Sequence, residues 1–148
     1  MTGSGAIAKY DEIIDSMIVL ARAVKSHRIV AGGPDSAELL INLQLRGYAR
    51  VVTMKSLRAA RARNDVALVA WPTASMKDLE ATLGRAADVL SASGVLVVWL
   101  GARDPVMSQR LRQALGRLGF RIESGTGCGQ GVAVAARRLS SLPAAIAA

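Results

Sequence analysis

Short apolar segments alternate with amphipathic segments along most of this chain, and this alternation restricts the fold more than any other feature. The apolar segments are HRIVAGG, ARVVTM, DVALVAW and GVLVVWLG. Strands that are apolar on both faces are typical of parallel sheets that are covered on both sides. The alternation therefore predicts a three-layer α/β fold, in which helices cover both faces of a mostly parallel sheet.

The amphipathic segments have helical spacing and recognisable ends. Helices are expected over Ala6–Val24, from Asp35 to about Arg46, from Ser75 to near Ser93-Gly94, and from Asp104 to Gly119. Asp35 and Glu38 have the spacing of a capping box, and Gly47 stops the same helix. Asp104 is the expected N-cap of the last helix, with Pro105 at its first position.

The last part of the chain has the pattern of a β-hairpin. Two strand-like segments, FRIES and GVAVAARRL, flank the glycine-rich stretch GTGCGQG. Because this stretch precedes a strand and not a helix, it lacks the helix N-terminus that would attract an anion, and we interpret it as the turn. The hairpin would place one antiparallel strand at the edge of the sheet. We expect an N-terminal amphipathic helix in residues 1–27, one α/β domain over residues 28–139 and a tail over residues 140–148.

Composition argues against several classes of protein. Cys128 is the single cysteine and His27 the single histidine, so we expect no internal disulfide, no metal site and no histidine-based catalytic triad. The longest apolar run, Val95–Leu100, is far shorter than the roughly 20 residues of a membrane-spanning helix. The N-terminus lacks a secretory pattern, so we expect a cytoplasmic protein without membrane contacts.

The net charge is +8, and the stretch from Arg46 to Arg63 contains no acidic residue. Arg58, Arg61 and Arg63 are candidates for binding an anionic ligand or nucleic acid. The alternative is a solvated helix surface that only keeps the protein soluble. No aromatic residues alternate with these arginines, which argues against stacking on a single strand.

The order of the elements, with the last strand reversed, resembles the Rossmann-like fold of S-adenosylmethionine-dependent methyltransferases. The stretch LEATLGRAADVLSASGVLVVWLG, followed by LRQALGRLGFRIES and GVAVAARR, is similar to the second half of that family. NDVALVAW is similar to the family strand that leads to the active site. The resemblance covers about Arg28 to Arg138 and implies a sheet of about six strands.

The resemblance also indicates where the methyl donor would bind. The family has G-x-G-x-G after its first strand, and this chain has Ala31-Gly32-Gly33-Pro34-Asp35. At the end of the second strand the family has an acid that accepts hydrogen bonds from the ribose, whereas this chain has Lys55, which only donates. The candidate cofactor-binding residues are Gly32, Gly33, Asp35, Lys55 and Trp71.

Two further departures from the family concern the middle of the chain. Between Lys55 and Asp65 there is room for one abbreviated connection, so one crossover unit, whose strand helps to bind the adenine in the family, is missing. The segment Ala70-Trp71-Pro72-Thr73 lacks the Asn or Asp that amino-group methyltransferases often carry there, and we therefore assign no catalytic residue.

These features favour a methyltransferase-like domain that is non-catalytic, holds no cofactor and acts through protein contacts, as a homodimer or with another protein. Two alternatives remain open. The first is an active methyltransferase with an atypical S-adenosylmethionine site, and the second is binding of an anionic ligand or nucleic acid through the Arg46–Arg63 stretch. Trp71 and Trp99 are expected beside the ligand crevice, either as a stacking platform or as core residues that fill the cofactor pocket.

Overall fold

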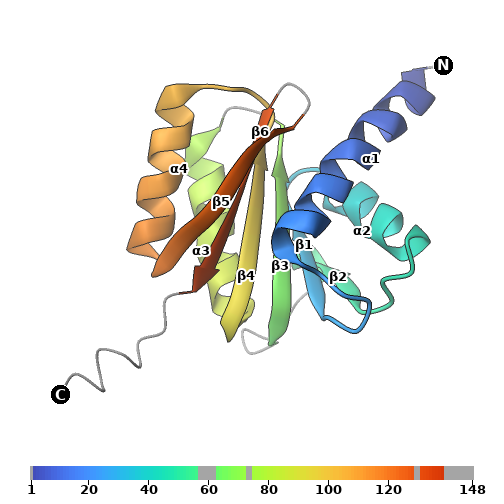
Figure 1. Cartoon of the computed structure of the whole chain (residues 1–148), viewed down its shortest axis with the longest axis horizontal. Coiled ribbons are helices and arrows are strands. Elements are labelled where there is room, and N and C mark those ends of the chain that lie inside the picture. Colours follow the sequence, from blue (N-terminus) through green and yellow to red (C-terminus); the bar gives the residue numbers. More distant parts are fainter. Residues whose placement is uncertain (1, 57–62, 73–74, 129–130, 139–148) are drawn as a thin grey trace.

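The computed structural model describes residues 2–56, 63–72, 75–128 and 131–138. One sheet contains all six strands in the order β2-β1-β3-β4-β6-β5 (Figure 1). The strands are β1 (Ile29–Gly32), β2 (Val51–Thr53), β3 (Asn64–Trp71), β4 (Leu90–Leu100), β5 (Phe120–Cys128) and β6 (Gly131–Arg138). Strands β1 to β4 are parallel, β6 is antiparallel to β4, and β5 is antiparallel to β6. The predicted α/β class and mostly parallel sheet are confirmed.

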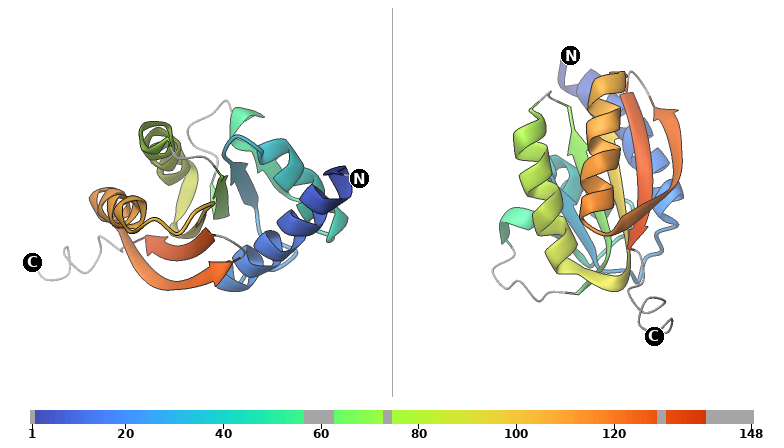
Figure 2. Two further views of the ribbon diagram at one scale, coloured as in Figure 1. Left: turned by 90° about the horizontal axis from the view of Figure 1, so that it is seen from above. Right: turned by 90° about the vertical axis from the view of Figure 1, so that its left-hand side faces the viewer.

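Helices cover both faces of the sheet, α1 and α2 on one side and α3 and α4 on the other (Figure 2). They are α1 (Thr2–Ala21), α2 (Ser36–Leu45), α3 (Met76–Val89) and α4 (Pro105–Arg117), and a short 3₁₀ turn, η1, spans Met54–Ser56. One apolar cluster joins α1 and α2 to the sheet through residues such as Ile14, Met17 and Leu43. The other joins α3 and α4 to the opposite face through residues such as Leu83 and Leu111.

Local sequence signals explain the start of α4 and the end of α2. The Asp104 carboxylate accepts hydrogen bonds from the backbone N–H groups of Val106 and Met107, which caps α4 as expected. Gly47 has a φ of +95° and ends α2, where the N–H of Tyr48 also bonds to the carbonyl of Leu43. The capping box at Asp35 is wrong, because its side chain makes no capping hydrogen bond. Its φ of −109° and ψ of 33° lie outside the extended region that an N-cap residue uses.

The boundary between α3 and β4 lies earlier than predicted. The helix ends at Val89 and not near Ser93-Gly94, and β4 begins at once with Leu90. Leu90 pairs with Asn64, and the register shifts before Val66 pairs with Val95. The Asn64 side-chain amide donates to the carbonyl of Val89 over 3.1 Å. This contact with a distant strand offers a physical reason why the helix stops there.

The C-terminal hairpin is longer than its sequence indicates. Gly125, Thr126, Gly127 and Cys128 belong to β5 and pair with β6, so the interpretation of GTGCGQG as a turn is wrong for these four residues. The remaining two residues before β6, 129–130, lie outside the described residues. The antiparallel strand β6 also lies between β4 and β5, so the edge strand is β5 and not β6.

At the opposite edge of the sheet, β1 is the one strand of the described residues that pairs with β2. The predicted loss of one crossover unit fits this arrangement, because η1 is the one element that the described residues contain between β2 and β3. Residues 57–62, which include the candidates Arg58 and Arg61, lie outside the described part, as do residues 139–148 of the expected tail.

Candidate functional site

Gly32, the last residue of β1, and Gly33, which follows it, are surrounded by the protein itself. Gly33 has a φ of +108°, and a Cβ at this position would overlap the carbonyl oxygen of Ala70 on β3. A Cβ on Gly32 would lie 2.7 Å from the Met54 methyl group. A side chain is therefore excluded at Gly33 by the backbone of β3, whether or not a ligand is bound, whereas at Gly32 the flexible end of the Met54 side chain can shift to make room.

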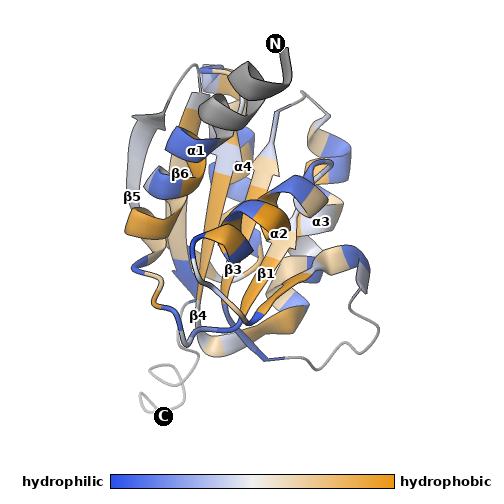
Figure 3. Cartoon of the chain, turned by 90° about the vertical axis from the view of Figure 1, so that its right-hand side faces the viewer, coloured by the Kyte–Doolittle hydropathy of each residue, from blue (hydrophilic) through white to orange (hydrophobic). Residues whose placement is uncertain are grey.

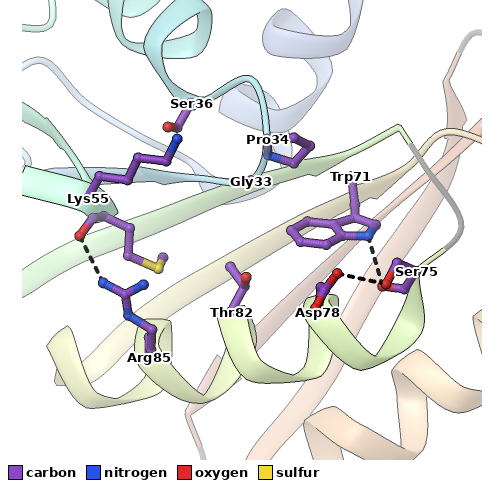
Figure 4. A pocket seen from close by; sticks show the side chains of 10 residues that line it. Gly33, Pro34, Ser36, Lys55, Trp71, Ser75, Asp78, Thr82 and Arg85 are labelled. Carbon is purple, nitrogen blue, oxygen red and sulfur yellow. Dashed lines mark hydrogen bonds between the residues drawn. The ribbon is translucent and has the colours of Figure 1, made fainter.

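A cavity of about 300 Å³ opens beside this loop, at the carboxyl ends of β1, β2 and β3 (Figure 4). We call it the strand-end cavity. Its lining residues are Gly33, Pro34, Ser36, Met54, Lys55, Trp71, Ser75, Asp78, Thr82 and Arg85. In open α/β sheets this is where ligands bind, and the volume is at the small end of the range for ligand pockets.

Trp71 forms one wall of the strand-end cavity. Its indole is only 6% exposed and belongs to the apolar cluster beneath α3. The indole N–H donates to the Ser75 carbonyl oxygen over 3.2 Å, and the Ser75 hydroxyl donates to the Asp78 carboxylate over 2.9 Å. The side chain is thus anchored as a core residue that also borders the cavity.

The other end of the cavity is positively charged. The Lys55 side chain extends towards Ser36, and Arg85 lies on the opposite side, on α3 (Figure 4). The Arg85 guanidinium donates to the carbonyl oxygen of Met54 over 3.2 Å. Within the described residues neither Lys55 nor Arg85 forms an ion pair with a carboxylate.

Three of the five candidate cofactor-binding residues, Gly33, Lys55 and Trp71, line the strand-end cavity. Gly32 lies next to it behind Met54, and Asp35 does not line it. Whether any of the five binds a cofactor stays a prediction. Arg63 is exposed and does not line the cavity either, so a role for it in anion binding also stays a prediction.

Trp99 does not border the cavity, and the expectation that both tryptophans do so is wrong. It is 4% exposed and belongs to the apolar cluster on the α1 and α2 side of the sheet. Trp99 pairs with Ala70, and Trp71 with Leu100, so the two indoles stand on opposite faces.

Sequence reasoning missed the residues that α3 contributes to the cavity. Asp78, Thr82 and Arg85 follow one another at intervals of four and three residues, which places them on one side of the helix. That spacing was a usable signal, but the polar side of an amphipathic helix ordinarily faces water.

The described residues contain no cluster of histidine, cysteine, aspartate or glutamate side chains that could hold a metal ion. None of the helices in this described part is both long and apolar enough to cross a membrane.

Comparison with solved structures places this fold among known ones. An S-adenosylmethionine-dependent O-methyltransferase from Thermotoga maritima is similar at a TM-score of 0.62 and 13% identity, over 86% of this chain and 65% of that one. The magnesium protoporphyrin IX methyltransferase of Synechocystis, solved with bound S-adenosylmethionine, is similar at a TM-score of 0.59 and 11% identity, over 91% of this chain and 80% of that one. The cyclase SpnF is similar at a TM-score of 0.62 and 14% identity, over 87% of this chain and 81% of that one. This chain thus spans less than two thirds of the length of the first of these proteins.

The chain has the Rossmann-like fold of the S-adenosylmethionine-dependent methyltransferases. No protein-family profile matches it, and no curated protein matches it. One of the similar structures is named as a cyclase, and a fold of this kind does not determine a reaction. The class is therefore a methyltransferase-like α/β domain, and its activity must be argued from the site.

Proposed function

We propose that this protein is a non-catalytic methyltransferase-like domain that acts through protein contacts, in the first place with a second copy of itself. The observation on which this depends is the end of β2. There Thr53, Met54 and Lys55 supply no carboxylate for a ribose, and the Met54 side chain packs against Gly32. Among the residues that the structure describes, no strand corresponds to the adenine-binding strand of the family.

Exposed apolar side chains near this edge support the protein contacts. Ile41 and Leu45 are 54% and 80% exposed and lie one turn apart on α2, on the side away from its buried residues Leu39 and Leu43. Val52 of β2 is also 36% exposed, but it pairs with Val30 of the cluster on the α3 and α4 side, so it lies on the other face of the sheet. We call the two residues Ile41 and Leu45 the α2 surface. Apolar colouring extends onto the outward side of α2 in Figure 3.

The position of β2 supports the same proposal. An edge strand presents unpaired backbone N–H and C=O groups, and natural proteins usually cover or protect such edges. In the family the missing crossover unit would lie beside β2. A two-fold symmetric dimer, the commonest form of homo-oligomer, would cover both the strand edge and the apolar side chains of α2.

Sedimentation velocity over a range of concentrations tests this proposal. We expect a dimer for the wild-type protein and a monomer for Leu45→Asp, because a carboxylate cannot be buried in an apolar contact without a partner. Val106→Asp is the matched control, since Val106 is 67% exposed but lies on α4 on the opposite side of the sheet. A wild-type monomer at every concentration, or a Leu45→Asp dimer, contradicts the proposal.

An active methyltransferase with an atypical site is the second candidate, and the strand-end cavity favours it. The cavity lies where the fold binds ligands, and the Gly33-Pro34 part of the family loop is present. Structures named as methyltransferases with bound S-adenosylmethionine and S-adenosylhomocysteine are among the similar ones. Titration with S-adenosylmethionine distinguishes the two candidates.

A further inference from the structure

The positively and negatively charged side chains of the strand-end cavity lie at opposite ends of it. Lys55 and Arg85 stand at one end without carboxylate partners within the described residues. The one carboxylate of the lining, Asp78, accepts a hydrogen bond from Ser75 at the other end (Figure 4). Seven residues of α3 separate Asp78 from Arg85, which corresponds to about 10 Å along the helix. The cationic end can therefore attract an anion without strong opposition from Asp78.

Ser36 adds a hydroxyl group to this cationic end. The residue is only 4% exposed, lines the cavity, and makes no side-chain hydrogen bond within the described part of the chain. It is also the first residue of α2, and the first turn of a helix offers backbone N–H groups that no other residue of the helix accepts. The Ser36 hydroxyl oxygen is accessible from the cavity and not sealed in the interior, so it can donate to a ligand there.

These donors come from three different elements. Lys55 belongs to η1, Arg85 to α3 and Ser36 to α2, so they approach the same end of the cavity from separate directions. A phosphate group has oxygens in several directions and forms its strongest hydrogen bonds with such charged donors and with helix N-termini. The remaining space is bounded by the Trp71 indole, Pro34 and Thr82.

We propose that the strand-end cavity binds a small planar organic phosphate. Its phosphate lies between Lys55, Arg85 and the first turn of α2, and its planar body lies against Trp71. Lys55 stands where the family has an acid that accepts hydrogen bonds from the ribose. Because lysine only donates hydrogen bonds, this position would bind an acceptor such as a phosphate oxygen. This inference goes beyond the proposed function and does not depend on whether the protein is a dimer.

Titration of the ¹⁵N-labelled protein with phenyl phosphate tests the proposal, with phenol as the uncharged counterpart. The two indole N–H signals of Trp71 and Trp99 are observed in a two-dimensional spectrum and assigned with Trp71→Phe. We expect a saturable shift of the Trp71 signal and none of the Trp99 signal, because the two indoles stand on opposite faces of the sheet. Phenol should bind at least tenfold more weakly.

Two variants examine the donors. Lys55→Met and Arg85→Met should each weaken binding by about tenfold, the usual effect of removing a hydrogen bond to a charged group. Lys77→Met is the control, since Lys77 is exposed on α3 but does not line the cavity. The spectra also show directly whether each variant is folded. The proposal would be overturned if phenyl phosphate caused no saturable shift of the Trp71 indole signal. It would also be overturned if the wild-type protein and Lys55→Met bound phenyl phosphate with equal affinity.

Discussion

Replacing Gly33 by alanine tests what the glycine after β1 does in this protein. If the glycine is present only to let a ligand approach, the substitution should cost the ligand-free protein little. If contacts within the fold require it, the free energy of unfolding should fall sharply. The structure favours the second outcome, because the added Cβ would overlap the backbone carbonyl of Ala70, which cannot move without disturbing β3.

The size of the effect follows from two contributions. The φ of +108° at Gly33 is one that side chains rarely adopt, which costs about 1–3 kcal/mol. Steric overlap in a well-packed interior adds about 1–3 kcal/mol. Gly119→Ala is the matched control, because Gly119 has a φ of +86° but no heavy atom within 4 Å of the Cβ position. We expect a loss of about 4 kcal/mol for Gly33→Ala and about 2 kcal/mol for Gly119→Ala.

Urea denaturation without any ligand measures both losses, with fluorescence and circular dichroism as independent probes of unfolding. The difference between the two variants, about 2 kcal/mol, isolates the contact with Ala70. Equal losses for Gly33→Ala and Gly119→Ala would refute the reasoning, since they would show that the Ala70 carbonyl accommodates a Cβ without cost.

Substitutions at three further positions test the fold by the same denaturation measurement. Asp104→Ala should destabilise by about 1 kcal/mol through loss of the α4 cap, and Asp104→Asn, which keeps an acceptor oxygen, should recover most of it. Gly116→Ala should stabilise by about 0.5 kcal/mol, because Gly116 lies in the last turn of α4 and no heavy atom outside the neighbouring helix backbone lies within 4 Å of its Cβ position. Leu83→Ala should destabilise by about 2–5 kcal/mol, because Leu83 is fully buried between α3 and the sheet. The reasoning for each position would be contradicted by one result. These results are an unchanged free energy of unfolding for Leu83→Ala, equal losses for Asp104→Asn and Asp104→Ala, and a lower free energy of unfolding for Gly116→Ala.

The parts of the fold that could be predicted depend on local signals. Asp104 and Pro105 mark the start of α4 through contacts with residues close to them in the sequence, and Gly47 marks the end of α2 through its own backbone conformation. The alternation of apolar strands and amphipathic helices likewise determines the layers, because each element must bury one side against its neighbours.

The parts that were missed depend on contacts between distant residues. The start of β4 at Leu90 involves its pairing with Asn64, which lies on another strand. Gly125 and Gly127 have low strand propensity, and they are extended because β6 pairs with them. Tertiary contacts override local preference in both cases.

The sequence predicted the residues of the strand-end cavity that follow or end the strands, but not the residues that α3 contributes to it. Lys55 and Trp71 follow strands whose carboxyl ends meet at one edge, so their convergence could be inferred from the order of the strands. Arg85 could not be placed in the same way, because its approach depends on how α3 rotates about its axis against the sheet. The side on which Trp99 lies depends on the pairing of β3 with β4, which the sequence does not determine.

Calorimetric titration with S-adenosylmethionine, repeated with S-adenosylhomocysteine, tests the central claim most directly. The account predicts no measurable heat of binding and no rise in melting temperature at millimolar ligand, because no carboxylate follows β2 in the sequence and the described part of the chain has no strand beyond β2 to hold the adenine. A dissociation constant in the micromolar range, with a matching thermal shift that is lost in Trp71→Ala, would show that the cavity still binds the methyl donor.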